Sequence, residues 1–273
     1  MNRLMRILRR AYNTYLLPRW PNPSYADDAQ FHFLFVITPP YSGSTAFANL
    51  MATSDRVSLL RHDGEGQWLV PGVCEPDRWD SDKPINYRSV KSVWLAKAQK
   101  QTKQKPDTTM ILEKSPPNMV RIHDLLSVFP NSSLLVNNRD PYANCSSILH
   151  RNYPIDELTD EQRQSVLTEI CEAGVGRSTR VMKIKNEFGA PLLTYEQFCA
   201  EPASVARTLD MPEITDTIDS EAKVRVKDYA PQAIANQNSR QIAKLNDDDI
   251  EAISNVLRRH TEVLAFFGYE LMS

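Results

Sequence analysis

The sequence is poor in the residues that build metal centres and disulfide frameworks. Its 273 residues include only four cysteines and five histidines. No two cysteines form a CxxC pair, and no spacing of histidine and cysteine is typical of a zinc site. The histidines are scattered, and we expect His123 and His150 to be structural. The sequence therefore predicts no metal site, and free thiols in a reducing compartment at Cys74, Cys145, Cys171 and Cys199.

Long hydrophobic runs and a strong net charge are also absent. No stretch approaches the roughly 20 apolar residues of a membrane-spanning helix, so we expect no membrane span and a cytoplasmic protein. The net charge is −2, which creates no global field toward nucleic acid. Hydrophobic residues make up 41% of the chain and charged residues 24%, values that are ordinary for a soluble globular enzyme. The sequence contains no repeats and no signal for oligomeric state.

The N-terminal 30 residues differ in character from the rest. Arginines at positions 3, 6 and 10 fall on one helical face, and apolar residues at 4, 7, 8 and 11 fall on another. We interpret residues 1–30 as a basic amphipathic segment. It either docks on its own domain or attaches loosely to a membrane surface or a partner.

Strands alternate with helices through residues 31–273, which we interpret as a single domain. The apolar run at 31–38 predicts a strand buried on both faces of a parallel sheet. Shorter strands are predicted at 108–113, 132–138 and 190–195. Helices are predicted from residue 44, and at 88–104, 119–129, 141–153 and 246–268, with a long functional loop at 61–86. This order predicts an α/β, P-loop-like three-layer fold with a central, mostly parallel sheet flanked by helices.

A tight loop joins the first strand to its helix. Residues 38–50 read TPPYSGSTAFANL, a phosphate-binding loop without the usual lysine. Gly43 lets the backbone approach a ligand, the helix N-terminus adds partial positive charge, and Ser42, Ser44 and Thr45 add hydroxyl donors. Such a loop suits one phosphate of modest charge better than ATP with magnesium. The alternative is a structural turn that binds no ligand.

A second anion site is predicted where the strand at 132–138 ends. Arg139 ends that strand, and Ser147 lies two turns into the following helix. Ligands of open α/β sheets bind at the carboxyl ends of strands, and an arginine can grip a phosphate with two hydrogen bonds. The alternative is a surface ion pair between Arg139 and Asp140.

Together these motifs resemble the sulfotransferases that use 3′-phosphoadenosine 5′-phosphosulfate (PAPS), in particular the bacterial and tyrosylprotein-sulfotransferase-like branches. The resemblance runs from Phe31 to about Pro202 and includes the closing FGYE. It is carried by the loop PYSGST, by EKSP at 113–116, by RDP at 139–141 with Ser147, and by Tyr195-Glu196.

The resemblance implies an activity and a set of site residues. It implies transfer of a sulfuryl group from PAPS to a hydroxyl or amine of a small-molecule acceptor, with the desulfated nucleotide PAP as product and no metal. The 5′ side of the donor would meet the loop Tyr41, Ser42, Gly43, Ser44, Thr45 and Ala46. The 3′-phosphate would meet Arg139 and Ser147, with Lys227 as a weaker candidate, and the adenine would meet Tyr195.

The chain departs from the family pattern at Tyr41, where the family loop usually carries lysine or arginine. A cation stabilises the charge that builds on the leaving oxygen. Lys114 matches the lysine of the family's E/NK[ST]P motif, and we expect it to supply that charge. The alternative is that Lys114 is paired with Glu113 or another acid.

The general base and the acceptor pocket are predicted in the loop at 61–86. Glu65 stands between two glycines in GEGQWL, which would let its carboxylate reach into a cleft. His62, Asp63 and Glu75 are the alternatives. His62, Trp68 and Trp79 are candidates for the acceptor pocket, and the acids of this loop permit a cationic acceptor.

Two other functions remain open from the sequence alone. A small-molecule kinase of P-loop type would need ATP and magnesium, and the missing loop lysine argues against it. A non-catalytic nucleotide-binding protein of the same fold is compatible with Tyr41.

Overall fold

The computed structural model describes residues 30–226 and 229–272. The predicted N-terminal segment and Lys227 therefore lie outside the described residues. Four parallel strands form the central sheet, in the order β2-β3-β1-β4. They are β1 (His32–Ile37), β2 (Val57–Leu59), β3 (Met110–Glu113) and β4 (Ser132–Val136).

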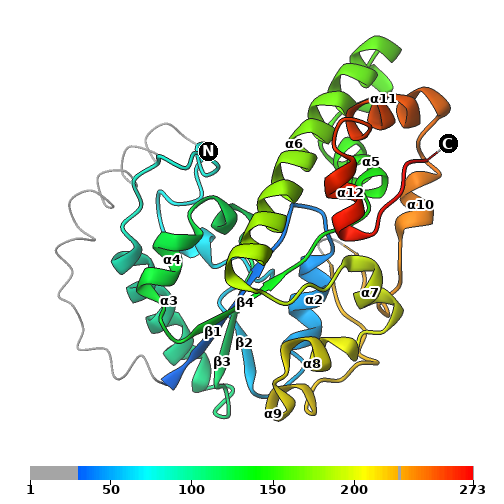
Figure 1. Cartoon of the computed structure of the whole chain (residues 1–273). Coiled ribbons are helices and arrows are strands. Elements are labelled where there is room, and N and C mark those ends of the chain that lie inside the picture. Colours follow the sequence, from blue (N-terminus) through cyan, green and yellow to red (C-terminus); the bar gives the residue numbers. More distant parts are fainter. Residues whose placement is uncertain (1–29, 227–228, 273) are drawn as a thin grey trace.

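Helices cover both faces of this sheet (Figure 1). The α-helices are α2 (Ser44–Met51), α3 (Tyr87–Thr102), α4 (Ile122–Val128), α5 (Pro141–Asn152), α6 (Asp160–Phe188), α7 (Tyr195–Ala200), α8 (Ser204–Leu209), α9 (Pro212–Thr215), α10 (Asn238–Ile242), α11 (Asp247–Leu257) and α12 (Thr261–Phe267). Short 3₁₀ helices occupy Gly66–Leu69 (η4), Pro116–Val120 (η5) and Ile155–Glu157 (η6).

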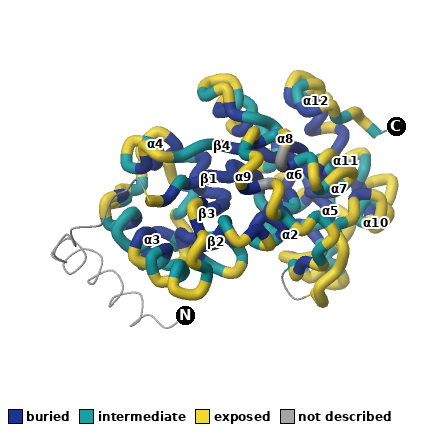
Figure 2. The backbone as a smooth tube through the Cα atoms, turned by 90° about the horizontal axis from the view of Figure 1, so that it is seen from below, coloured by how far each residue is buried: buried dark blue, intermediate teal, exposed yellow. Residues whose placement is uncertain are grey.

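The side chains of β1 alternate between the two faces of the sheet, as strand geometry requires. Phe33 and Phe35 pack with Trp94 of α3 and with Phe129, whose ring centroid lies 4.6 Å from that of Phe33. The end of α6 and α12 complete this face. Leu34 points to the other face, which α2, α7, α8 and α9 cover. The strands are buried between two helical layers, as Figure 2 shows, and the predicted three-layer α/β fold is confirmed.

A third apolar cluster joins helices beyond the end of the sheet. It contains residues of α5, the first half of α6, α11 and α12. The long helix α6 projects past the sheet, with α11 beside it (Figure 1). Arg163 of α6 clamps the buried carboxylate of Asp249 of α11 with two hydrogen bonds of 2.7 and 2.6 Å. This projecting part frames one side of the sheet's carboxyl edge.

Most of the predicted elements are confirmed, but the strand predicted at 190–195 is wrong. Only Leu192 forms an isolated bridge, to Val136 of β4. The chain then turns into α7 because the side chains of Thr194 and Gln197 form a reciprocal capping box at its start.

Other differences concern short or polar elements. The helix predicted at 246–268 is two helices, α11 and α12, which break around His260. Both contribute to the third cluster, and α12 also packs on the sheet. Neither β2 nor α6 was predicted.

Candidate functional site

Strands β1, β3 and β4 end at the same edge of the sheet because they are parallel. A cavity of about 500 Å³ opens at this edge. Eleven of the site residues expected from the sequence line it: Tyr41, Gly43, Ser44, Thr45, Ala46, Glu65, Trp79, Lys114, Arg139, Ser147 and Tyr195. Ser42 is buried beneath the loop, and His62 and Trp68 are exposed side chains that do not line the cavity.

The loop after β1 turns through two left-handed residues. Tyr41 has a φ of 64° and Gly43 a φ of 80°, and the first is a strained conformation for a tyrosine. A Cβ at Gly43 would lie 2.3 Å from a ring carbon of Tyr195, so only glycine fits there. Gly43 is also the N-cap of α2 and brings no side chain to the N–H groups of the first turn. Ser44 and Thr45 begin that helix at the cavity wall, where its N–H groups can serve an anion.

The side chain of Tyr41 leads away from this turn. Its hydroxyl donates to Oδ1 of Asn152 at 2.7 Å, at the end of α5. Its backbone carbonyl, by contrast, accepts from Nη1 of Arg139 at 2.9 Å. Tyr41 therefore binds Arg139 through its main chain.

Arg139 is 7% exposed and is held on several sides. Its Nη1 also donates to Oγ of Ser147 at 3.3 Å, and its Nε donates to Oδ1 of Asn238 at 2.8 Å. The guanidinium carbon lies 4.4 Å from the centre of the Tyr195 ring. Nη2 is buried without a hydrogen-bond partner in the described part of the chain. Burial lowers the pKa of Arg139 from its ordinary value.

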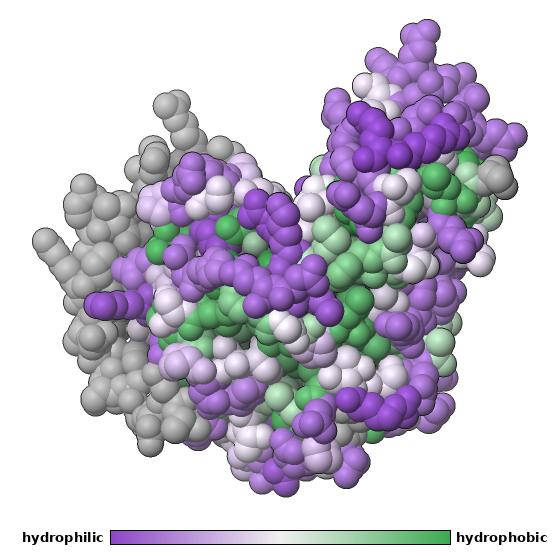
Figure 3. All heavy atoms as spheres, in the orientation of Figure 1, coloured by the Kyte–Doolittle hydropathy of each residue, from purple (hydrophilic) through white to green (hydrophobic). Residues whose placement is uncertain are grey.

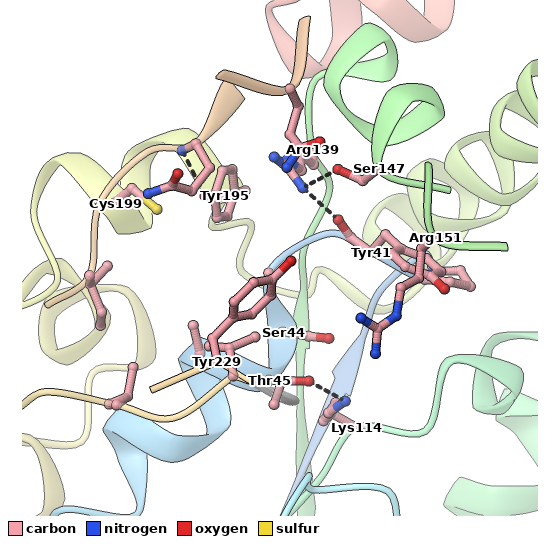
Figure 4. Close-up of a pocket in the computed structure, with 18 of the residues that line it drawn as sticks. Tyr41, Ser44, Thr45, Lys114, Arg139, Ser147, Arg151, Tyr195, Cys199 and Tyr229 are labelled. Atoms are coloured by element: carbon pink, nitrogen blue, oxygen red, sulfur yellow. Dashed lines mark hydrogen bonds between the residues drawn. The ribbon is translucent and has the colours of Figure 1, made fainter. Parts of the chain in front are cut away.

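Asp140 does not form the surface pair that was the alternative for Arg139. Its carboxylate caps α5 by accepting from the N–H of Ala143 at 2.8 Å. Because Asp140 is committed to the helix, the guanidinium of Arg139 stays directed at the loop and the cavity (Figure 4).

Lys114 and Glu65, the two residues expected to be catalytic, meet directly. Lys114 is 2% exposed, and its Nζ donates to Oγ1 of Thr45 at 3.0 Å and to Oε1 of Glu65 at 3.1 Å. The other carboxylate oxygen of Glu65 accepts from the indole N–H of Trp68 at 2.8 Å. The lysine is thus paired with an acid and also reaches Thr45 of the turn after β1.

Glu113 holds the glycine-flanked segment of Glu65 in place. This carboxylate is fully buried and accepts from the N–H of Gly66 at 2.9 Å, from the N–H and hydroxyl of Ser115, and from the amide of Asn118. Burial raises the pKa of Glu113 to about 7, although these donors oppose the shift. A Cβ at Gly64 would lie 2.9 Å from Cγ of Lys114, so the flanking glycine lets the segment approach the lysine.

Searches against known proteins bear on the fold. No family model matches the chain, and no curated protein matches it. Among solved structures, the sulfotransferase STF9 from Mycobacterium avium superposes with a TM-score of 0.54 at 15% identity, covering 90% of this chain and 79% of that one. The chain has a sulfotransferase-like fold.

Two further structures share this fold. The sulfotransferase from Alicyclobacillus acidocaldarius gives a TM-score of 0.51 at 10% identity, covering 89% of this chain and 98% of its own. The sulfotransferase domain of the Synechococcus PCC 7002 olefin synthase gives 0.51 at 14% identity, covering 93% and 100%.

Within this sulfotransferase-like fold, late segments also line the cavity. The Tyr195 hydroxyl donates to the carbonyl of Ala235 at 3.2 Å and accepts from the N–H of Gln237 at 3.0 Å. Figure 4 shows Tyr229 and Arg151 reaching toward the space between Arg139 and Lys114. Six further wall residues belong to no motif and were therefore not predicted from the sequence: Arg78, His150, Arg151, Tyr229, Gln237 and Lys244.

Other expectations concern the molecule as a whole. All four cysteines are free. In residues 30–226 and 229–272, no group of three or more candidate ligands could hold a metal ion. No helix in that part of the chain is long and apolar enough to cross a membrane.

Proposed function

We propose that the protein, through residues 31–273 as one domain, is a sulfotransferase. It moves a sulfuryl group from PAPS to a hydroxyl or amine of a small-molecule acceptor. One observation supports the proposal. Arg139, held beside Ser147, and the Gly43–Thr45 turn, beside Lys114, present two separate groups of hydrogen-bond donors on the wall of a single cavity (Figure 4).

The residues present fit a nucleotide with phosphates at two ends. Arg139 keeps one buried Nη2 donor without a partner in the described chain, and a phosphate oxygen would satisfy it. The turn at Gly43 offers main-chain N–H groups to a second anion. Tyr195 lies between these groups, stacked on Arg139 and packed against Gly43. Its buried ring therefore fixes their relative position and lines the space that an adenosine would occupy.

The donor, when bound, supplies a sulfuryl group whose bond to a 5′-phosphate oxygen breaks as a bond from sulfur to the acceptor oxygen or nitrogen forms. Glu65 takes the proton that the acceptor loses. Lys114 and the Thr45 hydroxyl donate to the leaving oxygen and stabilise its growing charge. The ion pair of Lys114 with Glu65 suits this division of roles, because an anion at Thr45 competes with the carboxylate for the lysine and leaves Glu65 able to accept a proton.

Tyr41 does not contradict this assignment. Its hydroxyl is bound by Asn152, and its carbonyl positions Arg139. Lys114 supplies a positive charge from β3 within hydrogen-bond distance of the turn, in place of the cation that the family loop usually carries.

Calorimetry with PAP and with ATP plus magnesium tests the donor site. We expect PAP to bind and ATP to bind at least about tenfold more weakly, because the site lacks a point charge for a triphosphate chain. Tighter binding of magnesium–ATP would favour the kinase instead.

Transfer from radiolabelled PAPS to a panel of phenols, alcohols and amines tests catalysis. We expect turnover in the presence of a metal chelator, and a loss of kcat of about 10²–10⁴-fold in Glu65→Gln, with little change in PAP affinity. Binding of PAP without any transfer across the panel would favour the non-catalytic alternative.

A further inference from the structure

Two arginines lie near the Glu65 end of the cavity, one on its wall and the other against Trp79, a residue of that wall. Arg78 lines the cavity with Glu65, Trp79 and Lys114. Arg177 of α6 places its guanidinium carbon 4.8 Å from the centre of the Trp79 ring. Both arginines are partly buried. In Figure 3, a hollow separates the projecting helices from the lobe of α3 and α4.

Arg78 is connected to the proposed base through one side chain. The indole of Trp68 donates its N–H to Glu65 at 2.8 Å, and the guanidinium carbon of Arg78 lies 5.4 Å from the centre of the same indole. The carboxylate of Glu65 is bound by Lys114 and Trp68, and it forms no ion pair with Arg78. Arg78 therefore stands beside the reacting end of the cavity with its charge uncompensated by the base.

Neither arginine forms an ion pair within residues 30–226 and 229–272. The guanidinium of Arg78 donates to the sulfur of Cys74 at 3.2 Å. Two acids of the loop are paired with other cations, Asp63 with Arg61 and Asp77 with Lys83. Partly buried cations without a counter-ion are costly. Burial, and then the charge of Arg78, lower the pKa of Arg177.

Arg121 shows what a purely structural arginine looks like in the same region. It is buried, and its guanidinium donates to the backbone carbonyls of Arg78 and Asp80, which ties the loop to α4. Arg78 and Arg177 make no such contacts with the main chain in the described residues. Their aromatic neighbours fix the positions of the guanidinium groups, and in the described residues the only hydrogen bond from either group is that of Arg78 to Cys74.

We propose that Arg78 and Arg177 bind an oxyanion of the acceptor, so that the acceptor is a hydroxyl- or amine-bearing molecule that also carries a carboxylate or a related oxyanion. Trp79, which contacts the guanidinium of Arg177 and lies on the cavity wall, supplies a flat apolar surface beside that anion. The inference rests on the proposed function, since it names the class of molecule that Glu65 would activate. It also gives the acceptor a negative charge, whereas the acids of the loop at 61–86 would suggest a cationic acceptor.

Calorimetry on the full chain saturated with PAP tests the inference, because PAP then fills the donor's own anion sites. The probes are benzoate and phenyl phosphate, with benzamide as the neutral match and benzylamine as the cationic one. We expect at least one oxyanion probe to bind at least about tenfold more tightly than benzamide. Arg78→Gln and Arg177→Gln should each abolish that preference, and benzoate against phenyl phosphate identifies the preferred anion.

Arg180→Gln is the matched control, since Arg180 is an exposed arginine of the same helix, whereas Arg177 is partly buried against Trp79. It should keep the preference for the oxyanion. Arg177→Gln should leave the melting temperature unchanged or higher, because it removes a repulsive charge, whereas loss of a structural arginine would lower it.

The outcomes separate this inference from the proposed function. Equal binding of benzoate, phenyl phosphate and benzamide, tighter binding of benzylamine, or a preference that survives in both variants would overturn the inference while PAP binding stands. Failure of the wild-type chain to bind PAP would overturn the proposed function. If the chain without PAP still preferred the oxyanion probes and lost that preference in the arginine variants, the two arginines would form an anion site unrelated to sulfuryl transfer.

Discussion

At the scale of single residues, three buried charged side chains organise the cavity in different ways. Arg139 is bound on several sides and keeps one donor unused. Lys114 is shared between Thr45 and Glu65. Glu113 faces away from the ligand space and binds the segment that carries Glu65. The first two can exchange a protein partner for a ligand, whereas Glu113 is a positioning residue.

Replacing Arg139 with alanine should weaken PAP binding. A charge-assisted phosphate contact contributes about 1.5–3 kcal/mol, which corresponds to a rise in the dissociation constant of about 10- to 150-fold. Calorimetry with PAP measures the change, and Arg180→Ala serves as the control. Unchanged affinity in Arg139→Ala would count against the 3′-phosphate site.

Glu113 should make stability depend on pH. Its folded pKa of about 7 lies above its ordinary value of 4.5, so the folded protein holds this proton more tightly than the unfolded chain. The stabilisation is fully present below pH 4.5 and is lost as the pH rises to about 7.

Melting temperatures between about pH 5 and about pH 8 test this dependence. The wild-type chain should lose more stability over that interval than Glu113→Gln, which cannot titrate at this position. The pH slope is the readout, because the substitution also disturbs the hydrogen bonds to Ser115 and Asn118. Parallel pH profiles for the two proteins would show that Glu113 does not carry the effect.

At the scale of elements, continuous apolar runs were the reliable signal. Strands β1, β3 and β4 could be predicted because both faces of each are buried. The apolar pair Leu192-Leu193 misled the prediction, since Pro191 has no N–H to extend the pairing and Thr194 starts a helix. Helix α6 could not be predicted, because polar residues and two glycines, Gly174 and Gly176, interrupt the apolar pattern of its buried face. Its capping box at Thr159 was the signal that could have found it.

In the candidate site, too, local sequence patterns predict some features and not others. The turn after β1 and Arg139 could be predicted because each follows a strand and the strands are parallel. Lys114 could be predicted only from its match to the family's E/NK[ST]P motif. The pairing of Lys114 with Glu65 and the approach of Arg177 to Trp79 could not. They depend on how residues far apart in the sequence pack together, which no local pattern records.

The capping box of α7 should matter to ligand binding. Thr194→Ala removes the cap that precedes Tyr195 and should cost about 1 kcal/mol of stability. It should also weaken PAP binding, because the start of α7 positions the ring that contacts Gly43 and Arg139. Thr159→Ala, at the equivalent position of the capping box of α6, should cost similar stability and leave PAP affinity unchanged. Equal PAP affinities in the two variants would contradict this role for α7.

At the scale of the whole molecule, the cavity joins parts with different cores. Its walls include Ala46 and Val224 from the sheet side and Tyr41 and Lys244 from the side of the projecting helices. A ligand that contacts both sides should stabilise the folded chain as a unit. The contacts of the ligand with Arg139 and Lys114 would thus stabilise the whole chain and not only the residues around them.

Saturating PAP should therefore raise the melting temperature. A ligand at 100 times its dissociation constant contributes about 2.7 kcal/mol, or about 5 to 10 °C for a chain near this size. Differential scanning fluorimetry measures the shift, with ATP and magnesium as the comparison. A larger shift with magnesium–ATP than with PAP would overturn the assignment of the nucleotide.

The contact between Gly43 and Tyr195 has a consequence for related chains. An added Cβ at Gly43 would lie inside the tyrosine ring's van der Waals envelope, and its φ of 80° already disfavours other residues. Homologues that replace the glycine must shrink or move the aromatic ring 152 positions later in the chain. We therefore expect these two positions to covary, so that an aligned set of homologous sequences would record the shape of the nucleotide pocket without any structure.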